Sequence, residues 1–102
     1  MGLYSVSKSA VIMLTQSLAL ELGADNIQVN SIAPGTVRTK FSQALWQNDD
    51  LYHKTIAATP LGRIGNPEDL AGAVLYLASA ASNWVTGSVI VIDGGAMLGE
   101  GL

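Results

Sequence analysis

Residues 27–39 read IQVNSIAPGTVRT, a segment that has the pattern of a short strand and runs directly into a Pro-Gly turn rich in hydroxyl groups. One segment with a helical pattern precedes this stretch, and further segments with helical patterns follow it. In parallel α/β sheets, ligands bind in the crevice at the carboxyl ends of the strands, which is where this turn would lie. The stretch therefore predicts an α/β protein with a ligand site after its first strand. Pro-Gly taken alone also fits an ordinary strand-ending turn.

The residues of the turn suit a nucleotide cofactor. Gly35 has no side chain that would block a ring or a ribose, and the backbone amides that follow it can donate hydrogen bonds. Thr39 adds a hydroxyl group. We interpret the turn as a candidate cofactor loop.

A second chemical signal lies near the beginning of the chain, where Tyr4 and Lys8 are four residues apart. In a helix this spacing puts both side chains on one face. The Lys8 ammonium would then lower the pKa of the Tyr4 phenol from its usual value of about 10. Tyr4 could then give a proton to a carbonyl oxygen or remove one from an alcohol. The same spacing also occurs by chance on solvated helices.

The pattern predicts a first helix from about Tyr4 to Gly23, because Gly23 is a plausible C-terminal stop. An apolar stripe at helical spacing is expected to face the sheet, and a second face is left for a partner subunit. The stripe comprises Val11, Leu14, Leu18 and Leu22, and the second face carries Met13 and Leu20.

Asn66 and Pro67 are expected to open the last helix, and Arg63 to be a structural partner of Glu68 or Asp69. Residues 40–58 are more polar and predict one or two short helices. Residues 88–93 form a nearly continuous apolar run, typical of a strand covered on both faces. Two strands separated by helices predict a parallel, right-handed crossover.

Taken together and in order, these stretches resemble the C-terminal half of the short-chain dehydrogenase/reductase family over nearly the whole chain. The motifs that carry the resemblance are Tyr4-x-x-x-Lys8, VNSIAPG at 29–35, PLGR at 60–63, GNPED at 65–69, and the last strand with Gly94-Gly95. The resemblance implies the C-terminal part of a doubly wound, parallel-sheet, Rossmann-like fold. Within it we expect two parallel strands with flanking helices.

By this resemblance the chain would serve an oxidoreductase that moves a hydride between NAD or NADP and a secondary alcohol or ketone, as a carbonyl reductase or alcohol dehydrogenase does. Tyr4 would be the catalytic acid/base, and Lys8 would lower its pKa and hold the ribose of the cofactor. The residues implied for the nicotinamide end are Pro34, Gly35, Thr36, Val37 and Thr39. The family commonly forms homodimers or homotetramers.

Residues 40–58 correspond in the family to the variable substrate lid. Trp46 and Tyr52 in this segment could line an apolar substrate pocket, or could simply be packing residues. The chain begins just before Tyr4, so we expect residues 1–102 to be the C-terminal half of a single domain whose nucleotide-binding half is absent. The choice between NAD and NADP and the identity of the substrate are therefore open. A non-catalytic interaction or oligomerisation module is the alternative function.

The composition of the chain argues against several classes of function. The chain is 49% apolar and only 13% charged, which is rich in apolar residues for a domain that stands alone. The net charge of −3, without a basic cluster, argues against nucleic-acid binding and against a polybasic membrane anchor. One histidine and no cysteine predict no metal site. We see no targeting signal or membrane span and expect a cytoplasmic protein.

Overall fold

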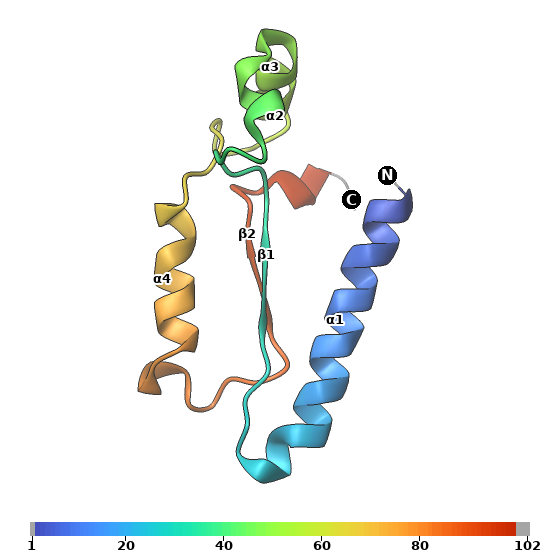
Figure 1. The fold of residues 1–102 in the computed structure, drawn as a ribbon, viewed down its shortest axis with the longest axis vertical. Helices are drawn as coiled ribbons and strands as arrows, with labels where there is room; N and C mark the ends of the chain where they lie inside the picture. Colours follow the sequence, from blue (N-terminus) through green and yellow to red (C-terminus); the bar gives the residue numbers. More distant parts are fainter. Residues whose placement is uncertain (1, 100–102) are drawn as a thin grey trace. The chain divides into compact units, whose positions relative to one another are not determined.

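The computed structural model describes residues 2–99, which form an α/β structure (Figure 1). The chain divides into two compact units, residues 1–32 with 73–90 and residues 33–72 with 91–102. The strands β1 (Ser31–Pro34) and β2 (Val89–Ile92) begin in the first unit and end in the second. Helix α4 (Glu68–Leu77) begins in the second unit and ends in the first.

β1 and β2 are neighbours in a two-stranded sheet. Ser31 N donates to Ser88 O at 3.0 Å, and Gly35 N donates to Ile92 O at 2.9 Å. Both bonds join residues with the same sequence offset, so the strands are parallel, as the sequence predicted. β1 is shorter than the predicted strand at its start, because residues 28–30 bind the turn before β2 instead of extending the ladder. Val91 is 43% exposed, so the expectation that this strand is covered on both faces is wrong for the described residues.

Asn30 is hydrogen-bonded to both sides of the turn that precedes β2. Its Nδ2 donates to Val85 O at 3.1 Å, and its Oδ1 accepts from Ser88 N at 3.0 Å. Gln28 Nε2 also donates to Val85 O, at 2.8 Å, and to Ser82 O. Ser82 is fully buried. These amide side chains thus set the register in which β2 begins beside β1.

Helix α1 (Gly2–Leu22) continues into a 3-10 turn (Gly23–Asp25). The predicted helix, from about Tyr4 to Gly23, thus begins two residues earlier and ends one residue earlier than expected. The left-handed residue that ends the turn is Asn26, with φ 59°, and its N–H donates to Gly23 O at 3.0 Å. Asparagine adopts this conformation more readily than most residues.

The predicted packing face of α1 was wrong for Val11 and Leu14, whereas the other two residues of the predicted stripe, Leu18 and Leu22, are half-buried. Val11 and Leu14 are 53% and 59% exposed, whereas Thr15 and Ala19 are buried. Thr15 tolerates burial because its hydroxyl donates to Val11 O within the helix, at 2.8 Å. Ala19 is small enough for the chain to approach closely, since a Cβ placed at Gly87 would lie 3.5 Å from the Cβ of Ala19. Within the first unit, α1 and the end of α4 lie on opposite sides of the strands (Figure 1).

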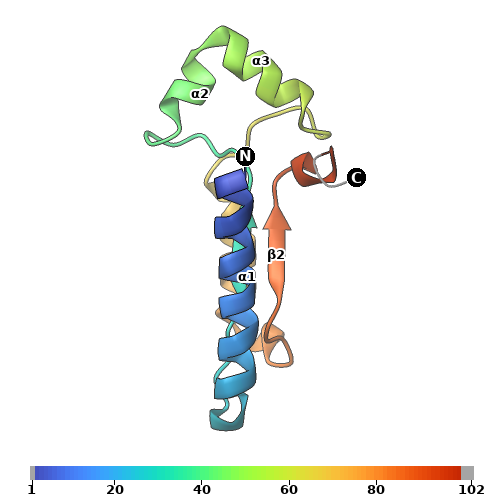
Figure 2. The same cartoon turned by 90° about the vertical axis from the view of Figure 1, so that its right-hand side faces the viewer.

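The second unit contains α2 (Gln43–Gln47) and α3 (Asp49–Ala57), as predicted for residues 40–58. The two helices meet at a sharp bend at Asn48 (Figure 2). Asn48 caps α3, because its side chain accepts from Leu51 N at 3.1 Å. None of the helices within residues 2–99 has the length and apolar content needed to cross a membrane.

Candidate active site

Tyr4 and Lys8 lie on α1 in the first unit. The side chain of Tyr4 is outside the part of the molecule that the structure describes. Lys8 is half-buried and shares a stripe of the helix with Thr15 and Ala19, which are buried. Lys8 therefore belongs to the packed face of α1 and not to its solvent face.

The predicted cofactor loop, residues 34–39, lies in the second unit and begins at Pro34, the last residue of β1. On one side Gly35 N donates to Ile92 O, at 2.9 Å. On the other side the loop forms a parallel bridge between Val37 and Gly65. Gly65 N donates to Thr36 O at 3.0 Å, and Arg38 N donates to Gly65 O at 2.8 Å. The loop is thus held between the end of β2 and the segment that leads into α4.

These bonds decide which amides of the loop remain available. The N–H groups of Gly35 and Arg38 are used within the protein, and that of Thr39 donates to Ser42 Oγ at 3.0 Å. No acceptor within residues 2–99 pairs with the N–H groups of Thr36 and Val37. Of the amides after Gly35 that the sequence offers as donors, those of Arg38 and Thr39 are therefore already used within the protein.

Gly35 has a structural role that the sequence did not reveal. A Cβ at this position would lie 2.6 Å from the Cβ and 2.9 Å from the Cα of Asp93. Asp93 is itself fixed, because its carboxylate accepts from Gly95 N at 2.8 Å and from Met97 N at 2.9 Å. The absence of a side chain at Gly35 therefore lets the two strand ends pass each other.

Ser42 and Trp46, at the start of the lid segment, hold the far end of the loop. Ser42 Oγ accepts from Thr39 N and donates to Val37 O. Trp46 Nε1 donates to Thr39 O at 3.2 Å, and the Arg38 guanidinium lies 5.2 Å from the centroid of the indole ring. Sequence reasoning missed Ser42, although a serine three residues after a threonine just before a helix is a known local capping pattern.

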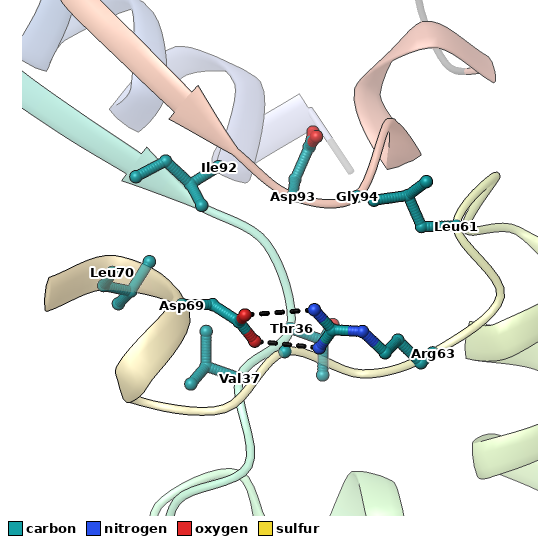
Figure 3. A pocket seen from close by; sticks show the side chains of 10 residues that line it. Thr36, Val37, Leu61, Arg63, Asp69, Leu70, Ile92, Asp93 and Gly94 are labelled. Atoms are coloured by element: carbon teal, nitrogen blue, oxygen red, sulfur yellow. Dashed lines mark hydrogen bonds and ion pairs between the residues drawn. The ribbon is translucent and has the colours of Figure 1, made fainter. Parts of the chain in front are cut away.

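A cavity of about 180 Å³ lies within the second unit, beside the loop (Figure 3). Thr36 and Val37 line it from the loop, and Ile92, Asp93 and Gly94 line it from the end of β2. Its remaining lining residues are Leu61, Arg63, Gly65, Asp69 and Leu70. Thr36 and Val37, whose amides have no acceptor in the described part of the chain, therefore border this cavity.

Arg63 and Asp69 face each other in this lining (Figure 3). Arg63 Nη1 and Nη2 donate to the two carboxylate oxygens at 2.8 and 3.0 Å, so the predicted structural partner of Arg63 is confirmed as Asp69. The hydrogen bond from Arg63, with a further one from the Asn66 N–H, lowers the pKa of Asp69 to about 2. The same pair raises the pKa of Arg63.

Comparison with known proteins identifies relatives of the chain. Residues 1–97 match a family described as enoyl-(acyl carrier protein) reductase. The chain is 45% identical over 96 residues to dehydrogenase/reductase SDR family member 4 of Oryctolagus cuniculus, covering 94% of this chain and 37% of that protein. It is 50% identical over 93 residues to a 3alpha-hydroxysteroid dehydrogenase of Mediterraneibacter gnavus, covering 91% and 36%. The chain thus spans little more than a third of the length of these relatives.

The chain is also similar to solved structures of dehydrogenases. A 4-hydroxyisoleucine dehydrogenase complexed with NADH is 39% identical, with a TM-score of 0.88, over 93% of this chain and 39% of that one. A gluconate 5-dehydrogenase from Burkholderia cenocepacia, in complex with NADP and tartrate, is 37% identical, with a TM-score of 0.87, over 93% and 37%. Proteins with this fold thus include one bound to NADH and one bound to NADP.

Proposed function

Because the chain belongs to the short-chain dehydrogenase/reductase family, we propose that it carries the catalytic pair and the nicotinamide loop of an oxidoreductase. The enzyme interconverts a secondary alcohol and a ketone with NAD or NADP. We also infer that residues 1–102 are the C-terminal part of one Rossmann-like domain and that residues 40–58 are its substrate lid. The bonds of Ser42 and Trp46 to Thr39 support the second inference, since they tie the start of this segment to the loop.

The observation that carries the proposal is the pattern of used and unused hydrogen-bond donors in the loop at residues 34–39. Its ends are hydrogen-bonded within the protein, while the amides of Thr36 and Val37 have no acceptor among residues 2–99 and border a cavity. Unpaired backbone donors beside a cavity suit a polar, flat group such as a carboxamide. Pro34 and Gly35 set the course of the loop, and Thr39 adds a hydroxyl group at its end. The residues present thus fit the nicotinamide end of the cofactor.

A bound nicotinamide supplies or accepts the hydride. Tyr4 acts as the general acid and base. Its phenol protonates the carbonyl oxygen during reduction, and its phenolate removes the hydroxyl proton during oxidation. The positive charge of Lys8 favours the phenolate and so brings the pKa of Tyr4 toward neutrality. The half-burial of Lys8 supports this role, because a charge that is partly removed from water acts more strongly on a neighbour.

The chain can be tested in the setting of a complete relative. In a chimaera, residues 1–97 replace the matching segment of the Mediterraneibacter gnavus dehydrogenase, and turnover is measured with the substrate of that enzyme. We expect Tyr4→Phe to lower kcat by roughly 10² to 10⁴ with little change in the KM for the cofactor. Lys8→Ala should lower kcat and also raise that KM, and Lys8→Arg should recover part of the binding. Tyr76→Phe, on an exposed position of α4, is the matched control.

A non-catalytic interaction or oligomerisation module remains the second candidate, and one observation favours it. Helix α1 exposes large apolar side chains, with Met13 at 66% and Leu20 at 86%. Such a surface suits a second protein surface, including another copy of the chain. The two functions differ in the chimaera, because a binding module would keep the same turnover in Tyr4→Phe as in the unmodified protein. That result would overturn the catalytic proposal.

A further inference from the structure

The ion pair between Arg63 and Asp69 has no part in the catalytic set proposed above, yet it lies next to the cofactor loop. Both residues line the cavity beside Thr36 and Val37, within the second unit (Figure 3). Isolated ion pairs at the protein surface generally contribute little to stability. The contacts of this pair with the main chain indicate a more specific role.

The Asp69 carboxylate binds both ends of the short segment 63–66. Oδ2 accepts from Arg63 Nη1 at 2.8 Å and from Asn66 N at 2.7 Å, and Oδ1 accepts from Arg63 Nη2 at 3.0 Å. Arg63 Nη1 also donates to Ile64 O at 3.2 Å. The Ile64 side chain is 5% exposed and anchors the middle of the segment. One carboxylate and one guanidinium thus fix the course of four consecutive residues.

Gly65 connects this segment to the loop. Its N–H and its carbonyl are the groups that pair with Thr36 O and Arg38 N. A Cβ at Gly65 would lie 3.5 Å from Thr36 O, 3.6 Å from Val37 Cγ2 and 3.7 Å from Asp69 Oδ2. Gly65 is therefore in direct reach of the ion pair on one side and of the loop on the other.

We propose that Arg63 and Asp69 are positioning residues for the cofactor loop, because they hold segment 63–66 where Gly65 pairs with Thr36 and Arg38 and thereby aim the unpaired amides of Thr36 and Val37. The role in cofactor binding rests on the proposed function, whereas the mechanical link from Asp69 to the loop does not. A bidentate pair is suited to this role because its two parallel bonds fix orientation as well as distance. The hydrogen bonds of the pair also lower the pKa of Asp69, so the carboxylate stays ionised further into the acid range.

The mechanical link is tested by amide hydrogen exchange of the 102-residue chain, followed by NMR in the absence of any cofactor. In Asp69→Asn we expect the protection of the Arg38 and Gly65 amides to fall about tenfold, which is the loss expected when one hydrogen bond to a charged group is removed. Arg63→Lys keeps the charge but not the bidentate geometry and should give a smaller loss. Glu68→Gln, which removes the neighbouring acidic charge in the first turn of α4, is the matched control and should change neither amide.

Two amides of the same unit report on its folding. Gly35 N donates to Ile92 O and Leu61 N donates to Gly94 O, and neither bond involves segment 63–66. Their protection should be retained in Asp69→Asn. Equal loss at all four amides would overturn the proposal, because the pair would then support the whole unit. Unchanged protection of Arg38 and Gly65 in both Asp69→Asn and Arg63→Lys would overturn it as well, and so would an equal effect of Glu68→Gln.

The consequence for the cofactor is tested in the chimaera, where the relative supplies the rest of the domain, by introducing the same substitutions and following the fluorescence of NADH or NADPH during titration. We expect an increase of about tenfold in the Kd for Asp69→Asn and no change for Glu68→Gln. A loosened loop with an unchanged Kd would refute the role in cofactor binding. Turnover retained by Tyr4→Phe would instead refute the proposed function and would leave the exchange result standing, because exchange needs no cofactor.

Discussion

The backbone at Gly35 passes so close to Asp93 that an added Cβ would lie 2.6 Å from the Cβ of that residue. Asp93 cannot easily yield, because its carboxylate accepts hydrogen bonds from the main-chain N–H groups of Gly95 and Met97. This contact joins the start of the cofactor loop to the end of β2. Gly35 is therefore required by the packing of the protein itself, in addition to any need of a ligand.

We expect Gly35→Ala to lower the free energy of unfolding by about 1–3 kcal/mol, because the added methyl group would force the two strand ends apart. Urea denaturation measures the change. Gly72→Ala provides the control, since a Cβ at Gly72, inside α4, meets nothing within 4 Å. That variant should be about 0.5–1 kcal/mol more stable. A neutral effect of Gly35→Ala would show that the strand ends can separate at little cost.

Asn30 is predicted to contribute more to stability than its place in a short connection suggests. Its amide group serves both Val85 O and Ser88 N. Asn30→Ala would remove the partner of the Ser88 N–H and would leave Val85 O with Gln28 Nε2 alone. We expect a loss of about 1–3 kcal/mol, read from urea denaturation. Asn83→Ala alters an exposed side chain in the same unit and should stay within about 0.5 kcal/mol of the unmodified chain. Equal effects of the two substitutions would contradict the assigned role of Asn30.

Ser42 is expected to order the end of the loop. In Ser42→Ala the Thr39 N–H and the Val37 carbonyl lose a shared hydroxyl partner. We expect the exchange of the Thr39 amide to accelerate by about fivefold to tenfold, equivalent to about 1 kcal/mol. NMR exchange measurements would detect this, with Ser17→Ala at an exposed position of α1 as the control. Unchanged exchange at Thr39 would mean that Trp46 alone suffices to hold the loop end.

The Asp69 carboxylate predicts a specific dependence of stability on pH. Its pKa is lowered from 3.8 to about 2 in the folded chain, so the ionised form stabilises the fold. The contribution is fully present above the unfolded pKa and is lost as the pH falls from about 4 toward 2. Denaturation of the unmodified chain and of Asp69→Asn between pH 7 and pH 2 should therefore give a stability difference that is constant near neutrality and shrinks in acid. A difference that persists at pH 2 would assign the effect to hydrogen bonding by the uncharged group.

Local patterns in the sequence predicted most of the elements. The prediction came close to the observed position of β2, the two short helices within residues 40–58, the last helix after Pro67 and the end of α1 beside Gly23. It placed the start of β1 four residues too early. An ion pair of Arg63 was also anticipated, with Glu68 or Asp69 as its partner, and the structure shows that the partner is Asp69. The order of motifs was sufficient to identify the family.

The packing face of α1 was not predictable in the same way. Hydrophobic periodicity selected Val11 and Leu14, whereas burial fell on Thr15 and Ala19. A threonine can be buried when its hydroxyl bonds to the preceding turn, and an alanine is preferred where another chain segment comes close. Both conditions depend on the partner surface, which a periodicity count does not include.

By itself the sequence determined the α/β class, the family and the chemical types of the candidate site residues, because these follow from local spacing and from the order of motifs. Only the tertiary structure decided which loop amides lack an acceptor among the described residues, why a side chain at Gly35 would meet Asp93, and that Ser42, Gly65 and Asp69 support the loop. Those features arise from contacts between residues that are distant in sequence, such as Gly35 with Asp93 and Thr36 with Gly65. Periodicity and spacing within a short stretch of sequence do not specify such contacts, because they form only when distant segments are brought together by folding.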